Sequence, residues 1–495
     1  MIDLPAPDPK TLSRRAEIAA AMTRIVPDGV IGDDATLTAF DCDALTAYRQ
    51  KPLLCVLPQT AEQISQVMAY AARENVRIVP RGAGTSLSGG ALPLADAILL
   101  GMSRMTRILE IDYENRCVVV QPGVTNASVT RAVQANGFYY APDPSSQIAC
   151  TIGGNVAENS GGIHCLKYGL TTQNLMGVEL VLLGGERIRL GGKHAGDGGL
   201  DLLSVVCGSE GLLGVVTEAT LRILPRAPVT RTLLIAFPTV RAAGETVAAI
   251  IASGVIPAAL EFMDRRCIEA VEAFCAPNYP AGAEAILLAE IDGMPAEVAD
   301  DAQRIADIAT GCGATEIRNC EDEAERARAW LGRKAAFGAM GRLEPDMLCM
   351  DGTIPRKRLP EMLDRISGMS DHYGLVCCNV FHAGDGNLHP LIVFDCMKDG
   401  ALEKAEAFGA DILKLCVEMG GVLTGEHGVG VEKKALMGEM FSDIDLAQQE
   451  KLKCAFDGAG LLNPGKVFPI LHACVELGHM HVRDGRLPFP NLPRL

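Results

Sequence analysis

Apolar residues recur along the chain with two different spacings. Spacings of three and four residues predict helices over residues 60–75, 124–137, 297–313, 323–340, 355–374 and 401–420. Short runs rich in β-branched residues predict strands over residues 76–80, 97–102, 215–228, 232–237 and 285–293. Because strands and helices alternate, we expect an α+β or α/β fold. A change of character after residue 225 and a proline-rich tail divide the chain into residues 1–225, 226–425 and 426–495.

The composition argues against two classes of partner. The 495 residues carry a formal net charge of −16, whereas phosphate binding needs a basic surface, so we expect no nucleic-acid partner. No run of about 18 apolar residues occurs without charges or breakers, so we expect no transmembrane segment. Residues 1–22 contain no apolar signal core, which predicts a cytoplasmic protein.

The cysteines bear on redox cofactors. All 17 are scattered between Cys42 and Cys474, and no CxxC pair occurs. Iron–sulfur clusters and structural zinc sites usually need grouped thiolates. We therefore expect this chain to carry no iron–sulfur cluster.

Four glycine-rich turns punctuate the chain. They read PRGAGTSLSGG (80–90), APDPSSQIACTIGGNVAENSGG (141–162), GSEGLLGVV (208–216) and LLNPGK (461–466). An ordered turn with free N–H groups can wrap a diphosphate, although such stretches are also common as flexible loops. The first turn matches neither the Rossmann nor the P-loop pattern. Four turns together favour a long cofactor that the backbone approaches closely.

Residues 381–390, FHAGDGNLHP, predict a hairpin with a histidine on each arm. Asp385 and Gly386 favour a tight turn, and a hairpin symmetric about them places His382 opposite His389, with Cβ atoms about 5 Å apart. Two imidazoles at that distance either stack without a function or share a ligand.

These turns, the hairpin and GEHGVG (425–430) occur in an order that resembles a known family. The chain is similar over nearly its whole length to the FAD-linked 2-hydroxyacid dehydrogenases of the vanillyl-alcohol oxidase superfamily. CMDGTIPR (349–356) and MHVRDGRLPFP (480–490) most resemble the flavin subunit of bacterial glycolate oxidase. The resemblance implies a two-part FAD-binding domain, made of residues 1–225 and the returning segment 426–495, and an α+β substrate (cap) domain over 226–425.

The resemblance also implies which residues contact FAD. The implied set is Arg81, Gly82, Gly84, Thr85, Ser86, Gly90, Pro142, Ser145, Gly153, Asn155, Gly162, Gly208, Glu210, Val215 and Asn463. Some superfamily members attach the flavin through a histidine in the first turn. No histidine lies between residues 80 and 90, so we expect non-covalent FAD.

By the same resemblance, His382, His389 and Glu426 match the ligands of a divalent metal. Two imidazoles and a carboxylate form an open site that suits zinc or manganese. His427 is then free to accept a proton from the substrate hydroxyl, whose pKa a bound metal would lower. Asn387 matches a residue near the substrate, and asparagine is also a common turn residue.

Arg333 matches a family arginine that pairs with a substrate carboxylate, as a planar guanidinium suits. The alternative is a solvated helix charge beside Lys334. Family members that act on 2-hydroxyglutarate have a threonine at the position of Phe337 and a lysine just ahead of Asp351. Their absence favours a smaller substrate with a single carboxylate.

We therefore expect an FAD- and metal-dependent enzyme that oxidises a small D-2-hydroxy acid, foremost glycolate to glyoxylate. Since the chain has no cluster motif, electrons are expected to pass to a separate iron–sulfur or quinone-linked partner or to a membrane acceptor. An iron–sulfur subunit and a second flavin-family subunit are the expected partners, and a partner is the expected link to the inner face of the membrane. The alternatives are a self-sufficient D-lactate dehydrogenase, a non-catalytic subunit that carries FAD for assembly, and a flavin enzyme of lipid ether synthesis.

Overall fold

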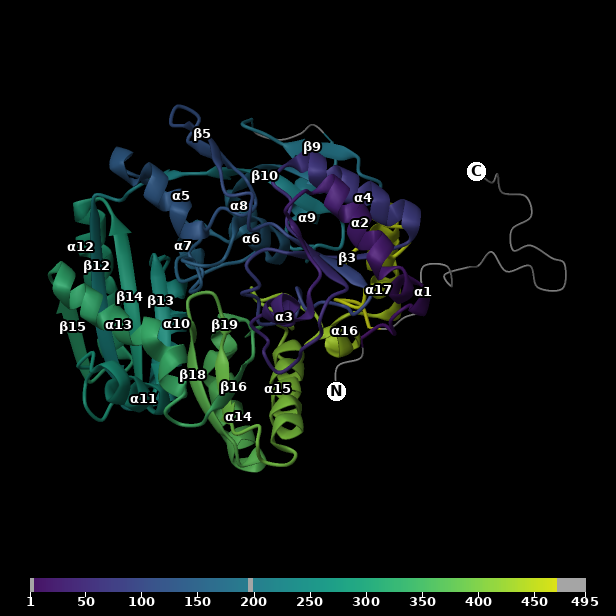
Figure 1. The fold of residues 1–495 in the computed structure, drawn as a ribbon. Coiled ribbons are helices and arrows are strands. Elements are labelled where there is room, and N and C mark those ends of the chain that lie inside the picture. Colours follow the sequence, from purple (N-terminus) through teal and green to yellow (C-terminus); the bar gives the residue numbers. More distant parts are fainter. Residues whose placement is uncertain (1–3, 195–198, 470–495) are drawn as a thin grey trace, which may run out of the picture.

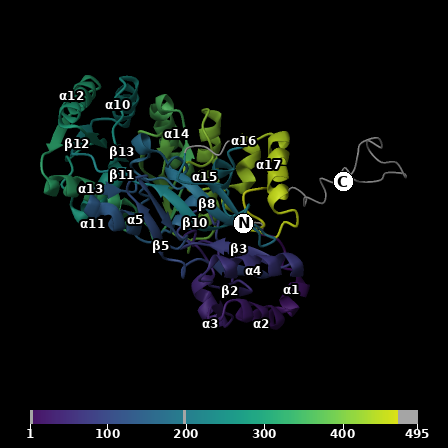
Figure 2. The same cartoon turned by 90° about the horizontal axis from the view of Figure 1, so that it is seen from above.

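The computed structural model describes residues 4–194 and 199–469, so the motif at 480–490 lies outside the described residues. Figures 1 and 2 show a large sheet covered by helices at one end of the molecule and two smaller sheets at the other. The smaller sheets come from the first half of the chain, and the large sheet comes from the middle region.

The first sheet holds the strands that flank the first glycine-rich turn. Its order is β1 (Val30–Ile31), β2 (Leu54–Val56), β4 (Ala97–Gly101) and β3 (Arg77–Arg81). Strands β2, β4 and β3 are parallel, so the turn after β3 leaves the sheet at its carboxyl end. Helix α4 (Ala61–Glu74) begins at Thr60, whose hydroxyl caps it, and packs its apolar stripe into the core under this sheet.

The second sheet is antiparallel and carries the other turns. Its order is β5 (Ile108–Asp112), β6 (Cys117–Val120), β10 (Val215–Arg222), β8 (Leu175–Val181) and β9 (Arg187–Gly191). The helices between these strands are α5 (Asn126–Val133), α6 (Ile152–Glu158), α7 (Cys165–Tyr168), α8 (Thr171–Asn174) and α9 (Leu202–Val206). Strands β7 (Phe138–Tyr139) and β11 (Leu224–Pro225) pair beside them.

The large sheet is also antiparallel. Its order is β15 (Glu316–Cys320), β12 (Val229–Phe237), β14 (Ala285–Gly293), β13 (Ala259–Asp264), β18 (Val376–His382), β19 (Asn387–Leu388) and β17 (Gly352–Thr353). Strand β20 (Pro390–Phe394) pairs with β18 and with β16 (Asp346–Cys349). Successive side chains along each strand point to opposite faces of the sheet. Leu233 and Ile235 therefore pack into the core on one face, and Leu234 packs into the core on the other.

Helices cover both faces of the large sheet (Figure 1). One face packs against α10 (Val240–Ala252), α12 (Pro295–Gly311), α14 (Leu359–Tyr373) and α15 (Ala401–Glu418). The other face packs against α11 (Arg265–Cys275) and α13 (Glu323–Met340). Both faces are therefore buried, which makes the sheet a rigid support for the histidine hairpin at its edge.

The end of the described chain returns to the first sheet. After α16 (Met437–Met440) and α17 (Asp443–Phe456), Leu462 forms a parallel bridge with Ile78 of β3. The backbone N–H of Asn463 donates to the Ile78 carbonyl at 2.7 Å. The N-terminal helices α1 (Pro9–Ser13), α2 (Arg15–Ile25) and α3 (Asp34–Leu37) complete this part of the molecule.

Candidate active site

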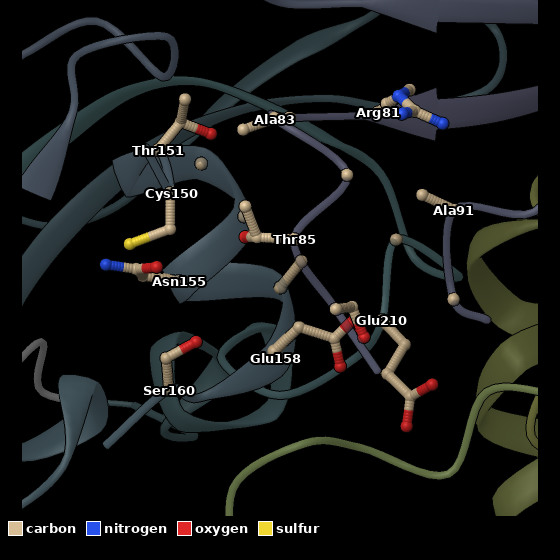
Figure 3. A pocket seen from close by; sticks show the side chains of 18 of the residues that line it. Arg81, Ala83, Thr85, Ala91, Cys150, Thr151, Asn155, Glu158, Ser160 and Glu210 are labelled. Atoms are coloured by element: carbon tan, nitrogen blue, oxygen red, sulfur yellow. The ribbon is translucent and has the colours of Figure 1, made fainter. Parts of the chain in front are cut away.

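A cavity of about 420 Å³ lies between the glycine-rich turns and the GEHGVG segment. Figure 3 shows Thr85, Asn155 and Glu158 around it. Most of the expected FAD contacts line it, namely Arg81, Gly82, Gly84, Thr85, Ser86, Gly90, Ser145, Gly153, Asn155, Glu210 and Val215. The structure therefore brings the first three turns to one cavity.

Four expected FAD contacts lie outside the residues that line this cavity. Asn463 is buried behind it, and its side-chain amide donates to the carbonyls of Gly90 at 3.1 Å and Glu210 at 2.8 Å. Pro142 accepts a hydrogen bond from Asn126, and Gly208 donates its N–H to the Val156 carbonyl. Gly162 faces a second cavity. The Asn463 side chain thus links the first and third turns by hydrogen bonds, and these turns themselves form the cavity wall.

The wall fits a long cofactor with phosphate groups. A Cβ on Gly82 would collide with the Thr151 hydroxyl, and one on Gly153 would lie 2.6 Å from a Pro122 carbon, so only glycine lets these segments pack. Gly84 has a φ of +72°, which glycine adopts without strain. The Thr151 hydroxyl is buried without a hydrogen-bond partner among the described residues. Such a wall offers backbone donors and an unsatisfied hydroxyl to a ligand.

Glu158 is a cavity residue that motif reasoning did not single out. It lies inside the second turn, at the end of α6, and its Oε2 atom is buried without a hydrogen-bond partner among the described residues. Burial raises the pKa of Glu158 well above its ordinary value, and the neighbouring Glu210 raises it further. Glu158 therefore holds a proton more readily than an exposed glutamate does. The sequence signal that could have identified Glu158 as a cavity residue was a carboxylate inside an otherwise apolar and glycine-rich stretch.

His382, His389 and Glu426 converge at the end of the cavity. Oε1 of Glu426 lies 3.3 Å from Nε2 of His382 and 3.3 Å from Nε2 of His389. All three donor atoms lie within 4.8 Å of one another. Nε2 of His389 is buried without a hydrogen bond in the described part of the chain. An unsatisfied nitrogen beside a second imidazole and a carboxylate fits a divalent metal.

Glu261 on β13 orients one of these histidines. Its Oε1 atom lies 2.7 Å from Nδ1 of His382, which leaves Nε2 to face Glu426. Burial lowers the pKa of His382, but Glu261 and Glu426 outweigh that effect and raise it to about 10. A carboxylate behind a histidine is the usual support of a metal-ligating imidazole. Nothing in the sequence around Glu261 indicated this role.

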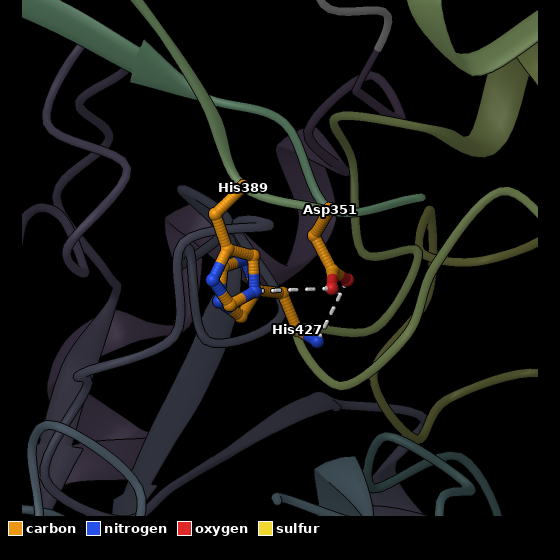
Figure 4. A group of neighbouring side chains, drawn as sticks. All are labelled: Asp351, His389 and His427. Atoms are coloured by element: carbon orange, nitrogen blue, oxygen red, sulfur yellow. Dashed lines mark hydrogen bonds and ion pairs between the residues drawn. The ribbon is translucent and has the colours of Figure 1, made fainter. Parts of the chain in front are cut away.

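Asp351 organises the GEHGVG segment (Figure 4). Its carboxylate accepts hydrogen bonds from the backbone N–H groups of Gly425, Glu426 and His427 and lies 3.1 Å from Nζ of Lys433. Burial raises the pKa of Asp351, yet Lys433 and the histidines hold it well below its usual range. Asp351, His389 and His427 also lie within metal-binding distance of one another. Because its oxygens already accept these bonds, Asp351 is the weaker candidate ligand.

His427 faces the cavity beside the convergent donors. Its ring stacks on that of His389 with centroids 5.0 Å apart, and its Nδ1 atom is buried without a hydrogen-bond partner among the described residues. Burial lowers the pKa of His427 to about 4, although Asp351 acts in the opposite direction. The neutral imidazole can accept a proton.

The register of the histidine hairpin differs from the symmetric arrangement expected from the sequence. His382 pairs with Asn387, and Asn379 pairs with Pro390, so residues 383–386 form the loop and the turn lies one residue earlier. Of the two predicted turn residues, Gly386 alone has a positive φ. The two imidazoles still meet, with centroids 5.0 Å apart at 81°. Oδ1 of Asn387 is buried without a hydrogen-bond partner among the described residues. Besides its place in the hairpin, Asn387 therefore has an acceptor atom available to a ligand.

Arg333 is buried, so the expectation of a solvated helix charge is wrong. Its Nε donates to Oε2 of Glu261 at 2.7 Å, and the side chain is 6% exposed. Glu261 therefore joins Arg333 and His382 in one chain of contacts. On the neighbouring face of α13, Lys334 and Phe337 line the cavity instead.

Comparison with known proteins bears on this arrangement. The family model for FAD linked oxidases, C-terminal domain, matches residues 226–467, and the FAD binding domain model matches residues 52–191. The glycolate oxidase subunit GlcD of Escherichia coli is 51% identical over 97% of this chain and 96% of its own length. The chain belongs to the FAD linked oxidases. As a member of this family it is an FAD-binding oxidoreductase.

Two further likenesses concern activity and fold. A D-lactate dehydrogenase of Archaeoglobus fulgidus is 34% identical over 83% of this chain and 90% of its own length. The structure of 4-ethylphenol oxidase from Gulosibacter chungangensis superposes with a TM-score of 0.79 at 18% identity, over 95% of this chain and 99% of that one. The fold of this FAD linked oxidase is thus the α+β fold of the vanillyl-alcohol oxidase type, as expected. Among residues 4–194 and 199–469, no helix is long and apolar enough to span a bilayer.

Proposed function

We propose that this protein oxidises a small D-2-hydroxy acid, foremost glycolate to glyoxylate, with non-covalent FAD and a divalent metal. The observation that carries the proposal is the meeting of His382, His389 and Glu426 at the end of the FAD cavity, with His427 beside them. The likeness to the glycolate oxidase subunit GlcD supports the substrate. A subunit that only carried FAD for assembly would have no use for these four side chains.

The chemistry divides between the cofactors and the chain. When bound, FAD would supply a hydride acceptor, and a divalent metal such as zinc or manganese would supply Lewis-acid chemistry. His382, His389 and Glu426 would hold the metal, and Glu261 orients His382 toward it. His427 takes the proton of the substrate hydroxyl, because its ring nitrogen is unpaired among the described residues and faces the cavity. Arg333 on α13 and Asn387 on β19 are proposed to position the substrate carboxylate and hydroxyl.

Phe337 supports a small substrate. It lines the cavity from α13 with Lys334, so the wall at this position is an aromatic ring where a second substrate carboxylate would need a polar partner. Cys349 and Met350, ahead of Asp351, are buried and likewise offer no charge. A substrate with one carboxylate fits these surroundings.

The test is an anaerobic absorption spectrum of the purified protein before and after adding substrate. We expect a yellow protein whose flavin absorbance bleaches with glycolate, and a higher kcat/KM for glycolate than for D-2-hydroxyglutarate. Full activity after replacement of His427 by alanine would contradict the assigned roles. A protein that cannot take up FAD would refute the proposal as a whole.

D-lactate is the second candidate substrate, because D-lactate dehydrogenases are among the relatives. The two substrates differ by one methyl group, and a pocket separates such pairs by only about 1–3 kcal/mol. The ratio of kcat/KM for glycolate and D-lactate decides between them.

The proposal includes partners and a division of the chain. Residues 1–225 with the returning segment 426–495 form the FAD-binding part, and residues 226–425 form the cap. An iron–sulfur subunit accepts the electrons and a second flavin-family subunit completes the assembly, since GlcD is named as a subunit. We place the protein in the cytoplasm, with a partner as its link to the membrane. Co-purification with those subunits and cell fractionation test these points.

A further inference from the structure

A second cavity, of about 780 Å³, reaches two of the three proposed metal ligands, His382 and Glu426. Its wall includes His382, Asn387 and Glu426, and continues over the segment 165–173 to Arg222 at the end of β10. Glu426 also lines the FAD cavity, so the two cavities meet at this side chain. With FAD in the first cavity, the second one remains as an approach to the metal site.

The wall of the second cavity is held by contacts between two distant parts of the chain. Nζ of Lys167 donates to the Asp292 carbonyl at 2.6 Å, and the hydroxyl of Tyr168 donates to Oδ2 of Asp292, also at 2.6 Å. Lys167 and Tyr168 belong to α7, whereas Asp292 belongs to β14 of the large sheet. One exposed and one half-buried polar contact therefore hold the two parts together, and Asp292 neutralises the charge of Lys167.

Arg222 is the cation that this wall leaves without a counter-ion. Its guanidinium donates to Oδ1 of Asn174 at 3.1 Å, and in the described part of the chain no carboxylate lies within ion-pair distance of it. Its Nε atom is buried without a hydrogen-bond partner there. Asp385 and Glu426 also line the cavity, at its inner end beside His382, and neither forms an ion pair with Arg222 in the described part of the chain. An unpaired guanidinium in a cleft attracts anions.

We propose that the second cavity is the route by which a small 2-hydroxy carboxylate reaches the metal site and the keto acid leaves, with Arg222 drawing the anion in. This inference rests on the proposed function. It adds an access route through the cavity that shares Glu426 with the first one, and it gives Arg222 a role in substrate capture and not in the chemical step.

The test measures anaerobic flavin reduction by stopped flow in the FAD-loaded protein, with the variants Arg222→Met and Arg222→Lys. We expect Arg222→Met to lower kred/Kd for glycolate about fivefold at low ionic strength, with the limiting rate kred within twofold of wild type. The difference should shrink in 0.5 M salt, where the Debye length falls to about 4 Å. Arg222→Lys should keep most of kred/Kd.

Two matched controls separate the route from general effects. Arg226→Met removes the same charge from an exposed position outside both cavities and should leave kred/Kd unchanged. Leu170→Trp narrows the second cavity and should lower kred/Kd, whereas Ile256→Trp, at an exposed position elsewhere, should not. Equal kred/Kd in wild type and Arg222→Met, or an equal loss in Arg226→Met, overturns the inference.

The outcome is separable from that of the proposed function. If glycolate, D-lactate and D-2-hydroxyglutarate all leave the wild-type flavin oxidised, the proposed function fails. The association rate of oxalate, read from the perturbed flavin absorbance, then decides the inference. A slower association in Arg222→Met than in Arg226→Met supports the route, and equal rates refute it.

Discussion

The buried ion pair of Asp351 and Lys433 makes a sharp prediction for Asp351→Asn. Both side chains are 0% exposed, and Nζ of Lys433 lies 3.1 Å from Oδ2 of Asp351. Asparagine has the same shape, so the change removes charge without creating a cavity. Removing one partner of a buried pair costs about 3–5 kcal/mol, because the other charge is left uncompensated.

Trp330 provides the assay, since it is the only tryptophan and lies on α13 against the large sheet. Urea unfolding followed by its fluorescence should show Asp351→Asn losing about 3–5 kcal/mol of unfolding free energy. The double variant Asp351→Asn/Lys433→Met should recover part of that loss, because it removes the unpaired charge. Glu361→Gln breaks an exposed ion pair with Arg358 and should cost under about 1 kcal/mol.

A loss below about 1 kcal/mol in Asp351→Asn would refute the reasoning on the buried pair. A double variant that is no more stable than Asp351→Asn would show instead that the backbone N–H groups of Gly425, Glu426 and His427 depend on the carboxylate itself.

Three further predictions concern the site and its surroundings. His427→Asn should slow flavin reduction by about 10²–10⁴-fold while FAD and metal content stay at wild-type levels, and unchanged reduction would exclude it as the base. Glu261→Gln should weaken metal binding about 10–100-fold in equilibrium dialysis, because His382 loses its support; retained affinity would contradict that. His164 lies 2.8 Å from an oxygen of Asp143 and 3.1 Å from one of Glu290. Burial lowers the pKa of His164, but the two carboxylates raise it well above 6.5, so its stabilisation is complete below pH 6.5 and is lost as pH rises through the raised pKa. The wild-type Tm should fall more steeply than that of His164→Gln from pH 6.5 upward, and parallel curves would refute this.

Regular patterns in the sequence were sufficient to predict many of the helices and strands. The predicted strand over 285–293 and the predicted helix over 323–340 match β14 and α13 at both ends, because the first is a short apolar run that ends at a glycine and the second is a run of helix-forming residues that Asp322 caps. The predicted register of the histidine hairpin was wrong because β18 has a second partner strand, β13, on which Glu261 lies opposite His382. Pairing with β13 competes with the turn preference of Asp385 and Gly386.

The polar contacts behind the site were beyond sequence reasoning. Glu261, Arg333 and His382 are far apart along the chain and meet only because β13 lies between β18 and β14 and α13 packs against that sheet. Lys433 lies three residues after the GEHGVG motif, but nothing local indicates that it would be buried against Asp351. Such contacts depend on tertiary packing, which a local pattern does not encode.

The pairing of Leu462 with Ile78 has a consequence for biosynthesis. Asn463 braces the first and third turns around the FAD cavity, yet it follows the whole cap in the chain. A ribosome therefore releases the first two sheets and the complete cap before it releases the residue that holds these turns together. Because domains fold as they are synthesised, we expect the cap to fold before the walls of the FAD cavity are complete, and FAD to be retained stably only after Asn463 is released. Nascent chains halted before Asn463 should consequently emerge colourless.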